Sequence, residues 1–192
     1  MRKQKIIIVP KKKTAAWQLF CGLRRTVDEI FTLWPEFVFV CIGTELVAGD
    51  SLGPLVGQRL KQLNLPDVRI YGTLDEPVHA LNLAWKVSLI KKRHPNSCVI
   101  AVDASFGSRF QLGRVSLQPG PIFPGLGVGK SLPPVGNISV TGIVCANGPD
   151  CHENLQKTPL SRIIPQVETI VTAATLLTQN RKGAIKYKEG LV

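Results

Sequence analysis

Acidic side chains that directly follow apolar runs are the residues of this sequence best placed to do chemistry. Asp103 comes straight after the apolar run at residues 97–102, and Asp50 ends the short loop that follows the run at residues 37–42. A carboxylate beside a buried strand is costly to desolvate unless it is paired or hydrogen-bonded, which makes Asp103 the most informative single residue. Both have a plainer interpretation, since aspartate is common in turns and Asp50 could cap the helix that begins after it.

A pair of carboxylates at one site has a defined chemistry. Two such groups cannot both ionise easily, so one keeps its proton while the other activates a water molecule, which allows amide hydrolysis without a metal. We therefore predict Asp50 and Asp103 as a catalytic pair that needs no cofactor and no metal. In open α/β sheets ligands bind beyond the carboxyl ends of the strands, so polar residues near the other strand ends are candidates for substrate binding. These are Glu45, Thr73, Glu76, His79 and Asn147.

Other reactive side chains are weaker candidates. His79 could line the site or be an ordinary surface residue, and His94 lies at a predicted helix end, where it would interact with the helix dipole. His152 follows Cys151, but adjacent residues rarely face each other usefully, so a cysteine protease is not favoured. The glycine-rich run at 125–131 resembles a phosphate loop, yet its glycine spacing is wrong and it follows no buried strand. We expect it to form a flexible rim of the site.

The elements that must position these residues alternate along the chain. Continuous apolar runs rich in β-branched residues predict buried strands, and apolar residues spaced three or four apart predict helices. This order indicates an α/β fold, a three-layer αβα sandwich whose mainly parallel or mixed sheet has about five strands. Strands are expected at residues 37–42, 68–71, 97–102, 113–117 (an edge strand) and 138–145, helices at 14–34, 52–63, 76–94 and 163–177, and a long loop at 119–136.

The bulk composition fits one globular domain in a reducing compartment. The chain has 192 residues, 44% of them hydrophobic, and its five cysteines form no CxxC pair that would indicate a zinc knuckle. It has no export signal and no apolar run of about 18 residues, so a soluble cytoplasmic protein without membrane contact is expected. We expect a basic arm at 1–13, an amphipathic helix at 14–35, a single α/β domain at 36–180 and a basic tail at 181–192.

The formal charge of +11 is partly concentrated at the start of the chain. The first 25 residues hold eight lysines or arginines and no acidic residue. Such an arm can contact nucleic acid weakly or attract acidic partners, and the alternative is a solvated tail. No aromatic residue precedes Trp17, so a base-stacking platform is not indicated.

Several longer motifs carry a resemblance to a known family. They are Ile-Gly-Thr at 42–44, Gly-Asp-Ser-Leu-Gly-Pro-Leu-Val-Gly at 49–57, Tyr-Gly-Thr-Leu-Asp-Glu-Pro-Val-His at 71–79, Val-Asp-Ala at 102–104 and Thr-Gly-Ile at 141–143. Over about residues 37–180 the chain resembles the sporulation protein YyaC family. That family is itself similar to the spore germination protease and, more remotely, to hydrogenase maturation endopeptidases.

The resemblance implies a phosphorylase/hydrolase-like fold and an acid-type pair of protease aspartates, which fall on Asp50 and Asp103. It also implies small spore proteins as substrates and a location in the cytoplasm of the forespore or spore core. Hydrogenase maturation endopeptidases bind a metal such as nickel through two acids and a histidine from the loop before the last strand. Residues 119–136 contain no histidine, so no metal is expected here.

The leading hypothesis is a sporulation-associated endopeptidase that cleaves a protein substrate through the aspartate pair. The alternatives are a non-enzymatic sporulation protein that binds a protein or nucleic-acid partner through the basic arm, and a nickel-dependent endopeptidase of the maturation type. A nucleoside or small-molecule hydrolase ranks last, since it would need a base-stacking aromatic such as Tyr71, Phe106 or Phe110 near the strand ends. The oligomeric state stays open.

Overall fold

A computed structural model describes residues 5–33, 35–125 and 132–180 of the protein. Six strands form one sheet: β1 (Ile6–Ile8), β2 (Phe37–Cys41), β3 (Val68–Tyr71), β4 (Cys98–Gly107), β5 (Val115–Pro119) and β6 (Ile138–Ala146). Across the sheet they lie in the order β1-β5-β6-β4-β2-β3. The run from β6 to β3 is parallel, whereas β5 is antiparallel to β6 and β1 is antiparallel to β5.

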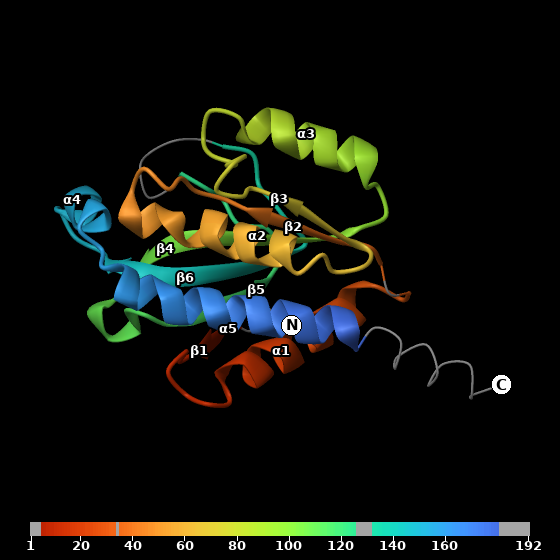
Figure 1. Cartoon of the computed structure of the whole chain (residues 1–192), viewed down its shortest axis with the longest axis horizontal. Helices are drawn as coiled ribbons and strands as arrows, with labels where there is room; N and C mark the ends of the chain where they lie inside the picture. Colours follow the sequence, from red (N-terminus) through yellow and green to blue (C-terminus); the bar gives the residue numbers. More distant parts are fainter. Residues whose placement is uncertain (1–4, 34, 126–131, 181–192) are drawn as a thin grey trace.

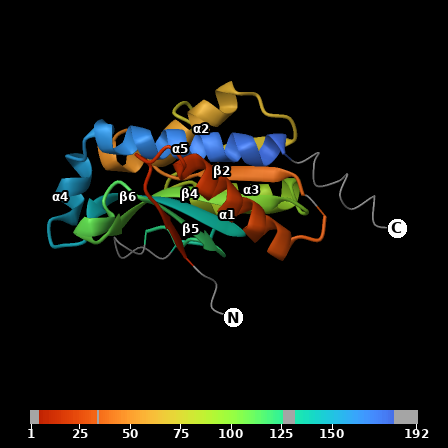
Figure 2. The same cartoon turned by 90° about the horizontal axis from the view of Figure 1, so that it is seen from below.

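Helices cover both faces of this sheet. One face carries α1 (Ala15–Ile30), α2 (Leu52–Gln62) and α5 (Leu160–Gln179), and the other carries α3 (Leu83–Arg93) (Figure 1 and Figure 2). The remaining short elements are the 3₁₀ helices η1 (Ala48–Ser51) and η2 (Arg109–Gln111) and the helix α4 (Cys151–Gln156). The three-layer αβα sandwich predicted from the sequence is confirmed, with six strands in place of about five. No described helix combines the length and the apolar character needed to cross a membrane.

Strand β2 shows why apolar runs without alternation form the centre of this sheet. All its residues are buried, because Phe37 and Phe39 belong to the core under α1, α2 and α5, whereas Val38 and Val40 belong to the core under α3. A strand covered on both faces needs apolar side chains at every position. Such strands hold the residues at their carboxyl ends in fixed positions.

Strand β1 was not predicted. Ile6–Ile8 lie inside the predicted basic arm at 1–13, yet they pair with β5, and Ile8 belongs to the same core as α1 and α5. This short run lies between lysines, so charge dominates its sequence pattern, whereas pairing and burial decide its structure. Because β5 pairs with β1 on one side and with β6 on the other, the prediction that residues 113–117 form an edge strand is wrong.

The helix predicted from Glu76 starts later. The structure places its first residue at Leu83, because the preceding segment follows the sheet as an extended chain. Val78 forms a parallel bridge with Ile42, and its carbonyl oxygen accepts a hydrogen bond of 2.8 Å from the Gly43 N–H. This segment lies beside the end of β2 and so forms part of the site described below.

Strand β4 runs further than predicted. It continues to Gly107, so Asp103 lies inside the strand, paired with Thr141 of β6, and does not follow its end. Helix α5 begins at Leu160, three residues before the predicted start at 163, and Pro165 lies inside it. The predicted strands at 37–42, 68–71 and 138–145 are confirmed by β2, β3 and β6.

Candidate active site

A cavity of about 930 Å³ lies at the carboxyl ends of the central parallel strands. Asp50, from η1, and Asp103, from β4, both line it. The rest of the wall comes from the end of β2, from β4, β5 and β6, and from the loops that follow β3 and β5. The fold therefore brings together the two carboxylates that the sequence singled out.

Asp50 is fixed by a tight loop at the end of β2. Gly43 has a φ of +137°, and a Cβ atom there would lie 2.0 Å from the carbonyl oxygen of Asp50, so only glycine allows this approach. The Thr44 N–H donates a hydrogen bond of 2.9 Å to Oδ2 of Asp50. This carboxylate is therefore bound to the loop before η1, and the interpretation of Asp50 as a cap of α2 is not needed to explain its position.

Burial dominates the electrostatics of both carboxyl groups. It raises the pKa of Asp50 from its ordinary value of 3.8 to about 6, although the hydrogen bond from Thr44 opposes part of this shift. Burial and then the negative charge of Asp50 raise the pKa of Asp103 well above 3.8, and a hydrogen bond of 2.8 Å from the Ala104 N–H to Oδ1 opposes part of that shift. Neither group has an ion-pair partner within the described part of the chain.

These shifts favour different states of the two groups. Asp50 is mostly ionised above about pH 6. Burial and the neighbouring charge of Asp50 both favour the protonated form of Asp103. A proton acceptor and a proton donor thus line one cavity, which is the arrangement required for general acid/base catalysis.

The residues predicted to bind substrate divide into two groups. His79 and Asn147 line the cavity with the two aspartates, and Nδ1 of His79 accepts a hydrogen bond of 3.3 Å from Leu81 N–H. Glu45, Thr73 and Glu76 are not among the described lining residues. Thr73 is buried in a turn, where its hydroxyl oxygen accepts a hydrogen bond from the Glu76 N–H and its own N–H donates to the Glu76 carbonyl oxygen. These contacts give Thr73 a role in holding the turn.

Several lining residues were not predicted as site residues. Ser116 and Gln118 of β5 and Ser139 and Thr141 of β6 all line the cavity. Each pair lies two residues apart on its strand, which places both members on the same face of the sheet. Alternation of polar and apolar residues was the sequence signal for this face, and at residues 113–117 it was interpreted as a sign of an edge strand.

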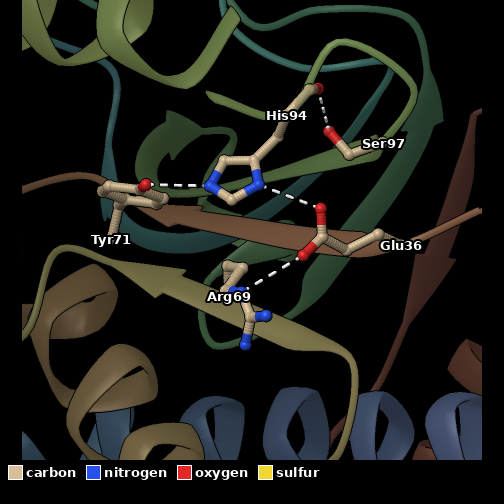
Figure 3. Close-up of polar contacts among 5 residues, drawn as sticks. All are labelled: Glu36, Arg69, Tyr71, His94 and Ser97. Carbon is tan, nitrogen blue, oxygen red and sulfur yellow. Dashed lines mark hydrogen bonds and ion pairs between the residues drawn. The ribbon is translucent and has the colours of Figure 1, made fainter. Parts of the chain in front are cut away.

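The other singled-out residues lie elsewhere. His94 is part of a cluster with Glu36, Arg69 and Tyr71 (Figure 3), where Oη of Tyr71 lies 3.0 Å from Nε2 of the histidine. Of the aromatic residues considered for base stacking, Phe106 lines the cavity, whereas Tyr71 is engaged in this cluster and Phe110 is 87% exposed. The side chain of His152, the residues 126–131 of the glycine-rich run and the tail at 181–192 lie outside the described residues.

The described residues do not fit a metal site of the three-ligand type. Among them, no group of three or more histidine, cysteine, aspartate or glutamate side chains lies close enough together to hold one ion. The two carboxylates of the cavity are a pair without a third such ligand. We therefore derive no chemical step that runs through a metal.

Comparison with known proteins decides the family. Residues 7–173 match the family described as "Protein of unknown function (DUF1256)". The chain belongs to this family. It is 44% identical over 139 residues to the uncharacterized protein YyaC of Bacillus subtilis (strain 168), an alignment that covers 72% of this chain and 68% of that protein. The resemblance to the YyaC family seen in the sequence motifs is thus confirmed.

One solved structure is also similar. The crystal structure of a [NiFe] hydrogenase maturation protease, HycI from Thermococcus kodakarensis KOD1, aligns with 80% of this chain and 99% of its own at a TM-score of 0.49 and 19% identity.

The DUF1256 match extends further towards the N-terminus than the resemblance over 37–180, because it begins at residue 7. It therefore includes α1 and most of β1, the elements that pack against α5 and β5.

Proposed function

We propose that this protein is an endopeptidase that hydrolyses peptide bonds of a protein substrate through Asp50 and Asp103. The observation that carries the proposal is the shared cavity, in which burial raises the pKa of both carboxyl groups and neither forms an ion pair with a cation of the described residues. Structural carboxylates are normally paired when buried, whereas catalytic ones are held in the state that their reaction needs.

The proposed reaction uses the two groups in different roles. The Asp50 carboxylate takes a proton from a water molecule, and the oxygen of that water attacks the carbonyl carbon of the peptide bond. Asp103 gives its proton to the substrate as the C–N bond breaks and an amine leaves. Asp50 then releases its proton to solvent and Asp103 takes one up, which returns the pair to its starting state.

The size and composition of the cavity support a peptide as the substrate. A volume of about 930 Å³ lies at the upper end of the range for ligand pockets, about 300–1,000 Å³, and is enough for several residues of an extended segment. Hydroxyl groups on the cavity wall can both donate to and accept from a peptide backbone. A role in sporulation and small spore proteins as substrates belong to the proposal, and they are supported by the family resemblance alone.

The proposal is tested by incubating the purified protein with a spore-protein extract and identifying new peptide termini by mass spectrometry. Asp50→Asn and Asp103→Asn should each abolish cleavage, while Asp75→Asn, an exposed aspartate outside the cavity, should cleave like the wild type. Cleavage should survive a chelator. Loss of activity on chelation and its return with nickel would replace the acid pair with a maturation-type metalloenzyme. No cleavage by any sample would favour a non-enzymatic binding protein.

A further inference from the structure

The cavity has a polar floor that reaches far from the acid pair. Three neighbouring strands each contribute a pair of polar lining residues two positions apart, and all six of these side chains lie on one face of the sheet. They are Asp103 and Ser105 of β4, Ser139 and Thr141 of β6, and Ser116 and Gln118 of β5. On this face α3 covers β2 and β4, and its core includes no residue of β5 or β6.

The register of the sheet arranges these side chains in rows. Asp103 pairs with Thr141, and Thr141 pairs with Ser116, so a row of hydroxyl groups leads away from the catalytic carboxyl group. In the next row, Ser139 pairs with Gln118. We call the set Ser116, Gln118, Ser139 and Thr141 the polar strip.

A single strong positive charge lies at the far end of the polar strip. Lys5 directly precedes β1, whose first residue Ile6 pairs with Leu117 of β5, and Lys5 lines the same cavity. It is the only lysine or arginine among the described lining residues. The cavity therefore has two carboxyl groups at one end, neutral hydrogen-bonding groups along its floor and an ammonium group at the other end.

The spacing of the strands sets the distance between the two ends. Lys5 and Asp103 are three strands apart, and neighbouring strands lie about 4.8 Å from each other, which gives roughly 14 Å. An extended peptide rises about 3.3 Å per residue, so this distance corresponds to about four or five residues of a substrate.

We propose that the polar strip binds the substrate segment on one side of the scissile bond, and that Lys5 pairs with a substrate carboxylate about four or five residues from that bond. This inference rests on the proposed endopeptidase function. Serine, threonine and glutamine side chains can hydrogen-bond a peptide backbone of any sequence, so the strip supplies general affinity. The ammonium group supplies the sequence preference.

The inference is tested on a peptide library prepared from a denatured bacterial lysate. Cleavage sites of the wild type should show aspartate or glutamate enriched at one position about four or five residues from the cleaved bond. Lys5→Gln should remove this enrichment, and Lys5→Glu should replace it with lysine and arginine. Lys11→Gln is the matched control, because Lys11 is an exposed lysine of the same segment that does not line the cavity, and it should keep the wild-type preference.

Synthetic peptides based on the best site identify the source of the carboxylate. Changing the preferred glutamate to glutamine should lower kcat/KM roughly three- to tenfold in the wild type and leave it unchanged in Lys5→Gln. If amidation of the peptide C-terminus has this effect and the side-chain change does not, the carboxylate is the terminal one. Cleavage without any acidic preference, or with a preference that Lys5→Gln leaves intact, would overturn the inference and leave the endopeptidase proposal standing.

A binding measurement separates the two proposals if no peptide is cleaved. Immobilised Asp103→Asn protein should retain acidic peptides from the same library, and the double variant with Lys5→Gln should lose them. That result would support the polar strip and Lys5 as a binding site while the endopeptidase proposal fails. Equal retention by both proteins would overturn the inference.

Discussion

Two groups of partly buried ionisable side chains lie at opposite ends of β2, and they are built on opposite principles. Asp50 and Asp103, beyond the carboxyl end, are two acids without an ion-pair partner among the described residues, and burial raises the pKa of both. Glu36, just before the strand begins, is surrounded by partners (Figure 3). Its neighbours in this second group, the Glu36 cluster, are Arg69, Tyr71, His94 and Ser97.

Each of the five residues drawn in the Glu36 cluster has a partner among the others (Figure 3). Oε1 of Glu36 lies 3.2 Å from Nε of Arg69, and Oε2 lies 2.9 Å from Nδ1 of His94. The other ring nitrogen of the histidine is 3.0 Å from Oη of Tyr71, and Ser97 donates to its carbonyl oxygen. These contacts join the start of β2 to β3 and to the end of α3, so this group stabilises the fold.

The two groups differ in how the desolvation of their charged side chains is compensated. A satisfied cluster repays the desolvation of its charges with hydrogen bonds and ion pairs. Each acid accepts a backbone hydrogen bond but has no ion-pair partner among the described residues, so we expect burial of the pair to lower stability. Changes that remove charge should therefore have opposite effects on stability at the two ends of β2.

The largest expected effect is that of Asp103→Asn. Loss of a general acid should lower peptidase activity by about 10²- to 10⁴-fold. The same change should raise the free energy of unfolding at pH 7 by roughly 1–3 kcal/mol. The folded-state pKa of Asp103 lies above its ordinary value of 3.8, so folding takes up a proton. Folding therefore becomes less favourable as the pH rises from 3.8 to the folded-state pKa.

Urea unfolding of both proteins at pH 7 and near pH 4 checks this prediction. The gain should shrink at the lower pH, where a substantial fraction of the Asp103 side chains is also protonated in the unfolded chain. A variant that is both inactive and less stable than the wild type at pH 7 would mean that Asp103 is a structural residue and would remove the contrast between the two ends of β2.

The pH dependence of activity should be the next largest effect. Asp50 must be ionised to accept a proton, and its pKa is raised to about 6, so kcat/KM should fall about tenfold for each pH unit below that value. Activity should also fall at higher pH, when Asp103 loses its proton. A profile of kcat/KM that starts at pH 3 and extends into the alkaline range measures the lower limb and follows the upper one. A single limb centred near pH 4 would show that burial does not control Asp50.

The main elements of the fold could be predicted from the sequence, because runs such as 37–42 must be buried on both faces. Strand β1 could not, because Ile8 is buried through its pairing with Val115, a contact between residues far apart in the chain. The delayed start of α3 has a similar cause. The backbone of Val78 bonds the end of β2, and this tertiary contact overrides the local preference for a helix.

The candidate site was predictable where it depends on strand ends. Asp50 and Asp103 follow or interrupt apolar runs, and a carboxyl group there has few structural explanations. The polar strip was not predicted, because alternation in a strand shows only that its two faces differ. That Ser116 and Gln118 line a cavity depends on the neighbouring strands and on the loop after β5.

The third effect is a loss of stability in the Glu36 cluster. Glu36→Gln should lower the free energy of unfolding by roughly 1–2 kcal/mol, since it weakens two charge-assisted contacts of a side chain that is 31% exposed. Activity per folded molecule should stay unchanged. Glu29→Gln is the control, because its pair with Arg25 is more than 60% exposed on both sides and should contribute less than about 0.5 kcal/mol. Equal losses in both variants would mean that the cluster is an ordinary surface network.

The smallest expected effect is that of Tyr71→Phe, which removes only the hydroxyl group that contacts His94. The loss of one neutral hydrogen bond should cost roughly 0.5–1.5 kcal/mol by urea unfolding. If the contacts to the two ring nitrogens of His94 support each other, Tyr71→Phe should cost less in a Glu36→Gln background than in the wild type. Strict additivity in this double-mutant cycle would show that the two contacts act independently.

The corresponding cycle in the acid pair, Asp50→Asn with Asp103→Asn, should show coupling of the other sign, because removing either charge relieves the same repulsion.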